Sequence, residues 1–229
     1  MALHSDANEG VILLHGLCRT SGCMQQMSKA LSAAGFSVEN SSYPSRSGGI
    51  EKLSDGVISR AMGGETLKDC SKIHLVTHSL GGILVRSYFK RHKEERLGRV
   101  VMLGPPNGGS EVVDRLGAWW LFQKINGPAG IELGTHPQST PNRLGAVDFE
   151  LGVIAGDRSI NWINSLMIRG KDDGKVSVER TKVGGIKEHI TIHATHPFLM
   201  KNRRAIEYTI RFLEKGSFAD KPEQIQAAK

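Results

Sequence analysis

One serine in this sequence stands where a hydroxyl group can become a nucleophile. Ser79 lies in the run THSLGG, between an apolar segment and a segment with helical periodicity. A serine on so sharp a turn is held in a strained conformation, with its hydroxyl raised above the sheet. Gly81 supplies one of the small flanking residues that such a turn needs, whereas Thr77 replaces the first glycine of the usual GxSxG pattern. The competing interpretation is an ordinary turn in which the serine caps the helix.

A serine hydroxyl is a weak nucleophile until a neighbouring base removes its proton. His196, in the run ATHPF, opens the loop after the last expected strand. His193 is the alternative base, but it lies within the apparent strand. We therefore expect His196 to take the proton from Ser79 and to return it to the leaving group.

The base needs an acid that fixes its tautomer and stabilises the imidazolium. In folds with a nucleophile on such a turn, the partners follow in the order serine, acid, histidine. Asp172 and Asp173, in the run DDGKV, occupy the required position between serine and histidine. Asp173 is favoured because it immediately precedes a glycine, and Asp157 is a more distant candidate.

Negative charge that develops on a substrate carbonyl requires two hydrogen-bond donors, which together form an oxyanion hole. Leu80, the residue after the nucleophile, is expected to supply one backbone N–H group. The run LLHGL follows the first expected strand, and its Leu17 is expected to supply the other. His15 in the same run is expected to shape the loop rather than to act as a base.

These residues must be positioned by alternating strands and helices, the pattern of a largely parallel sheet with helices on both faces. The segments expected to form strands are 11–14, 36–40, 73–77, 99–103, 151–155 and 190–193. The segments expected to form helices are 24–34, 50–61, 81–92 and 203–213. The sequence therefore predicts an α/β fold in which each candidate residue follows a strand.

The length of 229 residues suits one compact domain over 1–229. Residues 117–145 interrupt the alternation and are expected to form an irregular, cap-like insertion. Trp119, Trp120 and Phe122 in this insertion are candidate substrate-binding residues. Two interpretations remain open for them, a short cap over an acyl-binding site and ordinary core under a long loop.

The runs LLHGL, THSLGG, DDGKV and ATHPF, in this order, resemble the bacterial lipase and esterase branch of the α/β-hydrolases. The small proteins described as PGAP1-like or triacylglycerol-lipase-like are the most similar group. The resemblance spans about residues 11–213. It implies a triad of Ser79, Asp173 and His196, oxyanion donors at Leu17 and Leu80, and a minimal lid or none.

The composition favours an ordinary globular protein and implies no cofactor. The formal net charge is +7, and a dense basic run over 86–99 is expected to be a solvated helix end rather than a nucleic-acid surface. Contact with an anionic lipid surface remains open. Three cysteines offer no metal-ligand spacing, although Cys18 and Cys23 are close enough to bridge in principle. No apolar run has the length of a membrane-spanning helix.

The expected function is hydrolysis of short to medium acyl esters by an esterase or small lipase. A thioesterase, a phospholipase or an acyltransferase would use the same triad, and a binding protein on a hydrolase scaffold is a further alternative. The amino-terminal segment 1–10 lacks the pattern of a secretory signal. The sequence therefore favours a cytoplasmic protein, or a secreted or periplasmic one if a signal has been removed.

Overall fold

The structure, a computed structural model, describes residues 8–160 and 162–219. The polar chain ends 1–7 and 220–229 therefore lie outside the described residues. The central sheet has the strand order β2-β1-β3-β4-β5-β6, and every pair of neighbouring strands is parallel. The strands are β1 (Glu9–Leu14), β2 (Ser37–Ser41), β3 (Lys72–His78), β4 (Leu97–Leu103), β5 (Leu151–Gly156) and β6 (Ile186–Ile192). The prediction of a parallel sheet is confirmed.

Nearly continuous apolar runs place the central strands inside the molecule. In β1 the residues from Val11 to Leu14 are fully buried, and β5 is buried along its whole length. A strand that is apolar at every position must be covered on both faces, because alternate side chains point to opposite faces. The sheet therefore requires a helical layer on each side.

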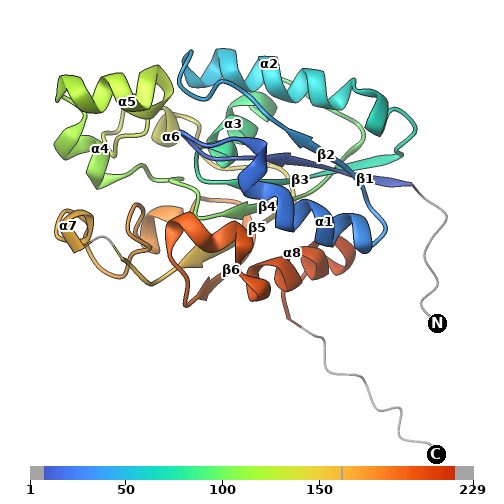
Figure 1. The fold of residues 1–229 in the computed structure, drawn as a ribbon. Helices are drawn as coiled ribbons and strands as arrows, with labels where there is room; N and C mark the ends of the chain where they lie inside the picture. The colour runs from blue at the N-terminus through green and yellow to red at the C-terminus, as the bar shows by residue number, and fades with distance from the viewer. Residues whose placement is uncertain (1–7, 161, 220–229) are drawn as a thin grey trace, which may run out of the picture.

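Helices form these two layers (Figure 1). Helices α2 (Ile50–Met62) and α3 (Leu80–Phe89) cover one face, and helices α1 (Gln25–Ala33) and α8 (Arg203–Lys215) cover the other. The remaining helices are α4 (Glu111–Leu116), α5 (Trp120–Ile131), α6 (Thr140–Arg143) and α7 (Trp162–Ser165). Short 3-10 helices span Ser21–Met24, Glu65–Leu67, Glu179–Thr181 and His196–Lys201. The helices predicted on both faces of the sheet are thus present.

Residues 117–145 are more regular than the sequence indicates. The expectation of an irregular insertion is wrong in this respect, because the segment contains α5 and α6. Gly127 (φ 66°) and Pro128 interrupt α5 with a kink, which explains why its sequence lacks a clear helical pattern. In Figure 1, α5 lies at one end of the molecule beside α4, whereas α6 lies beside α3, and Ala129 and Leu133 of the insertion belong to the main core.

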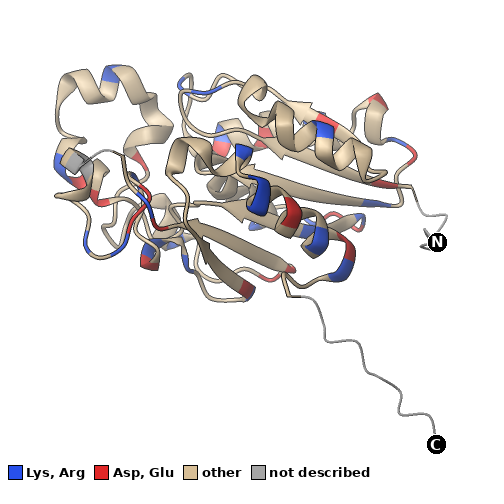
Figure 2. Ribbon diagram, turned by 60° about the horizontal axis from the view of Figure 1, so that its bottom comes forward, with Lys and Arg blue, Asp and Glu red and all other residues tan. Residues whose placement is uncertain are grey.

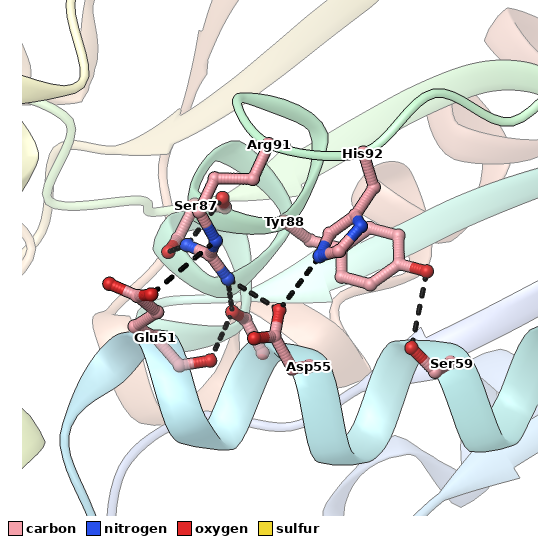
Figure 3. Close-up of polar contacts among 8 residues, drawn as sticks. Glu51, Asp55, Ser59, Ser87, Tyr88, Arg91 and His92 are labelled. Carbon is pink, nitrogen blue, oxygen red and sulfur yellow. Dashed lines mark hydrogen bonds and ion pairs between the residues drawn. The ribbon is translucent and has the colours of Figure 1, made fainter.

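Part of the basic run pairs with acidic residues elsewhere in the protein. Figure 3 shows Arg91 at the end of α3 facing α2, where it pairs with Glu51 and Asp55. His92 also contacts Asp55, with 3.2 Å between the ring nitrogen and the carboxylate. Figure 2 shows basic and acidic residues interspersed along the helices. Lys90, Arg91 and Lys93 are exposed, as the prediction of a solvated helix end requires, but Arg91 is also paired with acidic residues of α2.

Arg86 is the buried member of the same run. Its guanidinium donates to the carbonyl and side-chain oxygens of Asn107, at 3.0 and 3.1 Å. It also donates to the carbonyls of Pro141 (2.9 Å) and Gly145 (2.8 Å), so it joins α3 to the insertion. Burial lowers the pKa of Arg86 to about 10, which leaves the side chain charged at neutral pH.

The cysteines are free in the structure, with Cys18 exposed, Cys23 partly buried and Cys70 buried. Within the described part of the chain, no helix combines the length and apolar character needed to cross a bilayer.

We expect Arg86→Met to destabilise the protein by about 3 to 5 kcal/mol, because it leaves several buried carbonyl groups without a donor. Lys90→Met, at the exposed end of the same helix, is the matched control and should change stability by less than about 0.5 kcal/mol. Urea unfolding followed by circular dichroism measures both changes. Equal stability of the two variants would contradict the structural role of Arg86.

Candidate active site

Ser79 occupies the turn between β3 and α3. Its backbone has φ 53° and ψ −119°, a strained conformation for a residue with a side chain. Among the described residues, Cys18 is the only other non-glycine with positive φ. The strain is maintained because β3 ends at His78 and α3 begins at Leu80, with no linking residue except the serine.

The outgoing helix passes so close to β1 that a side chain would not fit at Gly81. A Cβ atom there would lie 2.9 Å from the carbonyl oxygen of Leu14 and 3.1 Å from that of His15. The incoming loop is equally close, since a Cβ atom on Gly16 would lie 3.1 Å from the Cβ of Ser79. The two glycines therefore let the turn and the loop after β1 touch.

Two of the expected partners are bonded to each other. The Nδ1 atom of His196 lies 2.7 Å from Oδ2 of Asp173, and both side chains are buried. The backbone N–H of His196 also donates to the carbonyl of Asp173 at 2.9 Å. Because the carboxylate accepts a hydrogen bond from Nδ1–H, the proton stays on Nδ1 and the other ring nitrogen is left free to act as a base.

Backbone groups hold the second oxygen of Asp173. Its Oδ1 accepts hydrogen bonds from the N–H groups of Lys175 (3.0 Å) and Val176 (2.9 Å). Asp172 instead accepts from the N–H of Gly174 and the hydroxyl of Ser165. The structure thus brings Asp173, and not Asp172, to the imidazole of His196.

The alternative histidine lies elsewhere. His193 contacts Asp157 at 3.0 Å, and its side chain is 73% exposed. An exposed pair of this kind is screened by water and can be disrupted at low cost. His193 and Asp157, the distant candidate for the acid, therefore pair with each other and not with the residues around Ser79.

His78 is a neighbour that the sequence did not single out. Its Nε2–H donates to the carbonyl of His196 at 3.0 Å, and the two rings lie 4.7 Å apart. Burial is the main cause that lowers the pKa of His78 well below the usual range, so the ring stays neutral. A neutral imidazole can support the loop of His196 without adding a competing charge beside it.

His15 holds the loop that leads to Leu17. Its ring stacks on Tyr43 with centroids 4.2 Å apart, and the hydroxyl of Tyr43 donates to the carbonyl of His15 at 2.6 Å. The Nε2 of His15 accepts from the N–H of Tyr43, while Nδ1 lies 2.8 Å from the carbonyl of Gly16. This arrangement agrees with the expectation that His15 shapes the loop.

One cavity of about 480 Å³ brings the candidate residues together. Ser79, His196 and Asp173 line it, and so does Leu17. Within the described part of the chain, no hydrogen bond joins the hydroxyl of Ser79 to His196. Catalytic hydrogen bonds often form only when substrate is bound, so the common cavity is the relevant geometric link.

Apolar side chains form much of the rest of the cavity wall. The side chains come mainly from α4, α5 and the segments beside them: Val112, Val113, Leu116, Phe122, Ile125, Leu133 and Ile160. Of the expected substrate-binding residues, only Phe122 lines the cavity. Trp119 and Trp120 do not, and they are 56% and 66% exposed.

Of the two expected oxyanion donors, Leu17 lines the cavity, whereas Leu80 follows Ser79 in the chain but is not a lining residue. Leu80 is the first residue of α3, so its N–H has no acceptor within the helix. Leu17 contributes to the cavity wall from the loop after β1. Among the described residues, no group of three or more His, Cys, Asp or Glu side chains is arranged to hold a metal ion.

We expect Gly81→Ala to destabilise the protein by about 1 to 3 kcal/mol, because the added methyl group would overlap backbone oxygens that cannot move independently. Gly56→Ala is the matched control in α2, where nothing lies within 4 Å of the added Cβ. That variant should gain up to about 1 kcal/mol from helix propensity. Urea unfolding of both proteins tests the contrast, and a stabilised Gly81→Ala would refute the close approach.

No protein-family model and no curated protein sequence matches the chain. Solved structures do match. Mature lipase BlEst2 from Bacillus licheniformis superposes with a TM-score of 0.70 at 18% identity, over 88% of this chain and 90% of that one. LipS and LipT, described as metagenome-derived lipolytic enzymes, give a match with a TM-score of 0.64 at 14% identity, over 91% and 94%. Phospholipase PlaB from Legionella pneumophila gives 0.61 at 21% identity, over 77% of this chain and 46% of that one. The sheet, the two helical layers and these similarities show that the chain has the α/β-hydrolase fold.

Proposed function

We propose that this protein is a serine hydrolase that cleaves carboxylic esters through Ser79, His196 and Asp173. The observation that supports this proposal most directly is the strained turn at Ser79, on the wall of the cavity that also exposes the His196–Asp173 pair. A strained residue at a cavity is a functional candidate, because the fold must offset the energetic cost of the conformation.

In the first half of the reaction, the hydroxyl of Ser79 attacks the carbonyl carbon of the ester. The free Nε2 of His196 takes the hydroxyl proton, and Asp173 stabilises the resulting imidazolium. Collapse of the tetrahedral intermediate breaks the ester C–O bond. The imidazolium returns its proton to the departing alcohol, and the acyl group remains on the serine.

In the second half, water replaces the alcohol. His196 removes a proton from the water as it attacks the acyl carbon, and it then returns the proton to the oxygen of Ser79. The N–H groups of Leu17 and Leu80 stabilise the negative oxygen in both halves. Removal of one such donor typically costs about 3 to 4 kcal/mol of transition-state stabilisation.

The apolar wall suggests the acyl group of the substrate. Each buried CH₂ of an acyl chain that contacts Phe122, Leu116 or Val113 contributes roughly 0.8 kcal/mol to binding. The volume of about 480 Å³ suits a ligand of small to moderate size. We therefore propose short to medium acyl esters as substrates, with Phe122 contacting the acyl chain.

The matched structures support ester chemistry without fixing the substrate, since one fold can host many reactions. BlEst2 is described as a lipase and PlaB as a phospholipase. A thioester, a phospholipid or an acyl acceptor other than water would use the same three residues. Relative rates on a panel of esters, thioesters and phospholipids of equal chain length separate these alternatives.

We expect Ser79→Ala to lower kcat for p-nitrophenyl butyrate by about 10⁴-fold to 10⁶-fold, since no other group replaces the nucleophile. A fluorophosphonate probe should label the wild-type protein and not the variant. Ser32→Ala, an exposed serine on α1, is the matched control and should retain both properties. Full hydrolysis by the Ser79→Ala protein would exclude the proposed mechanism.

We expect Asp173→Asn to lower kcat by roughly 10⁴-fold, because an amide cannot hold the imidazole in the required tautomer. Asp172→Asn is the neighbouring control, since Asp172 accepts bonds only from Gly174 and Ser165 in its own loop. Its kcat should fall by less than about tenfold, as expected for a small loop adjustment of roughly 1 kcal/mol. A larger loss of kcat in Asp172→Asn than in Asp173→Asn would identify Asp172 as the acid instead.

A further inference from the structure

Two cations line the cavity that contains Ser79. Arg19 belongs to the loop after β1, two residues beyond Leu17, and Lys175 follows Asp173 by two residues. Each cation thus follows a segment that the proposed mechanism uses. The apolar lining comes from other segments, chiefly α4 and α5.

Neither cation has an acidic partner among the described residues. The salt bridges of residues 8–160 and 162–219 include neither Arg19 nor Lys175. The nearest acid in the cavity wall is Asp173, and its oxygens are occupied by His196 and by two backbone N–H groups. Two positive charges therefore line a cavity whose single carboxylate is already in use.

The backbone of Lys175 is fixed in place. Its N–H donates to Asp173, and its carbonyl accepts from the hydroxyl of Ser110 at 2.8 Å. Desolvation lowers the pKa of the Lys175 ammonium; Arg19 lowers it further, whereas Cys18 and Asp173 act in the opposite direction. Lys175 is exposed and lines the cavity, so its side chain is accessible to a bound counter-ion.

Other charges near the cavity do not neutralise this pair. After burial and the neighbouring His196, the positive charges of Arg19 and Lys175 also lower the pKa of His78, so both act on the residues around Ser79. The thiol of Cys18, beside Arg19 in the sequence, donates to the carbonyl of Ile125. The site is therefore electrostatically complementary to an anion.

We propose that the natural substrate is an ester with an apolar acyl chain and an alcohol part that carries an anionic group, a phosphate or a carboxylate, which Arg19 and Lys175 bind. This inference rests on the proposed ester hydrolysis at Ser79. The anion belongs to the alcohol part because the acyl chain is matched by the apolar wall. Binding of the anionic group by both cations also favours catalysis, because it holds the ester in place beside Ser79.

The first test compares two esters that differ in one charge. The substrate 3-octanoyloxy-4-nitrobenzoate carries a carboxylate on its leaving group, and its methyl ester lacks the charge. We expect kcat/KM to be about tenfold or more higher for the carboxylate, with the preference decreasing at about 0.5 M NaCl as salt screens the pair. Equal or lower kcat/KM for the carboxylate would overturn the proposal.

Substitutions then locate the preference. Arg19→Gln and Lys175→Gln should each lower the ratio of the two kcat/KM values by about threefold to tenfold, mainly through KM for the carboxylate. Lys29→Gln, which removes an exposed charge on α1, is the matched control and should leave the ratio unchanged. A ratio that falls equally in all three variants would indicate net charge rather than a site, and would overturn the proposal.

A binding measurement separates this inference from the proposed reaction. The Ser79→Ala protein is titrated with 1-octanoylglycerol 3-phosphate and with 1-octanoylglycerol. We expect the phosphate to bind about tenfold more tightly or better, and Arg19→Gln in the same background to reduce the difference. If the wild-type protein does not hydrolyse esters but the variant binds the phosphate selectively, the hydrolase proposal alone is contradicted. If the wild-type protein hydrolyses esters but the variant binds the two ligands equally, the anion site alone is contradicted.

Discussion

The close approach of α3 to the end of β1 is the constraint on which the rest of the site depends. Gly81 lies against the carbonyl oxygens of Leu14 and His15, and this contact leaves room for only one residue between β3 and α3. That residue is Ser79, which must adopt positive φ. The neighbouring parallel strands then determine the other positions, because their carboxyl ends meet at one edge of the sheet.

Much of the fold could be predicted because the central strands are buried, and a buried strand requires apolar residues. A parallel sheet covered on both faces leaves apolar runs such as 11–14 and 151–155, and these runs are separated by helical periodicity. The insertion could not be predicted in the same way. Its helix α5 contains Gly127 and Pro128, and it exposes Trp120, so neither propensity nor burial gives the usual pattern. The buried Arg86 was missed because its partners lie 21 to 59 residues away along the chain.

The same distinction applies to the candidate site, because some of its residues could be predicted from the sequence and others could not. Ser79, Asp173 and His196 can be recognised from order and local context, since each follows a strand and each needs a particular residue type. His78, Arg19 and Lys175 cannot be recognised in that way. Their significance depends on which loops meet at the cavity, and this depends on packing between segments that are distant in sequence. A charged residue two positions beyond a candidate site residue has no special significance in the sequence, because its acidic partners are known only from the structure.

The acid proposed for the triad and one of the two cations proposed to bind an anion lie in the same segment, at Asp173 and Lys175. The carboxylate of Asp173 is stabilised by the N–H groups of Lys175 and Val176 and by the ring of His196, so it does not need the ammonium of Lys175. Backbone dipoles stabilise the anion without contributing a net positive charge that would oppose formation of the imidazolium. The ammonium group consequently stays available to the cavity. Residues 173–175 can thus hold the carboxylate of Asp173 through the backbone and present a cation through the side chain of Lys175.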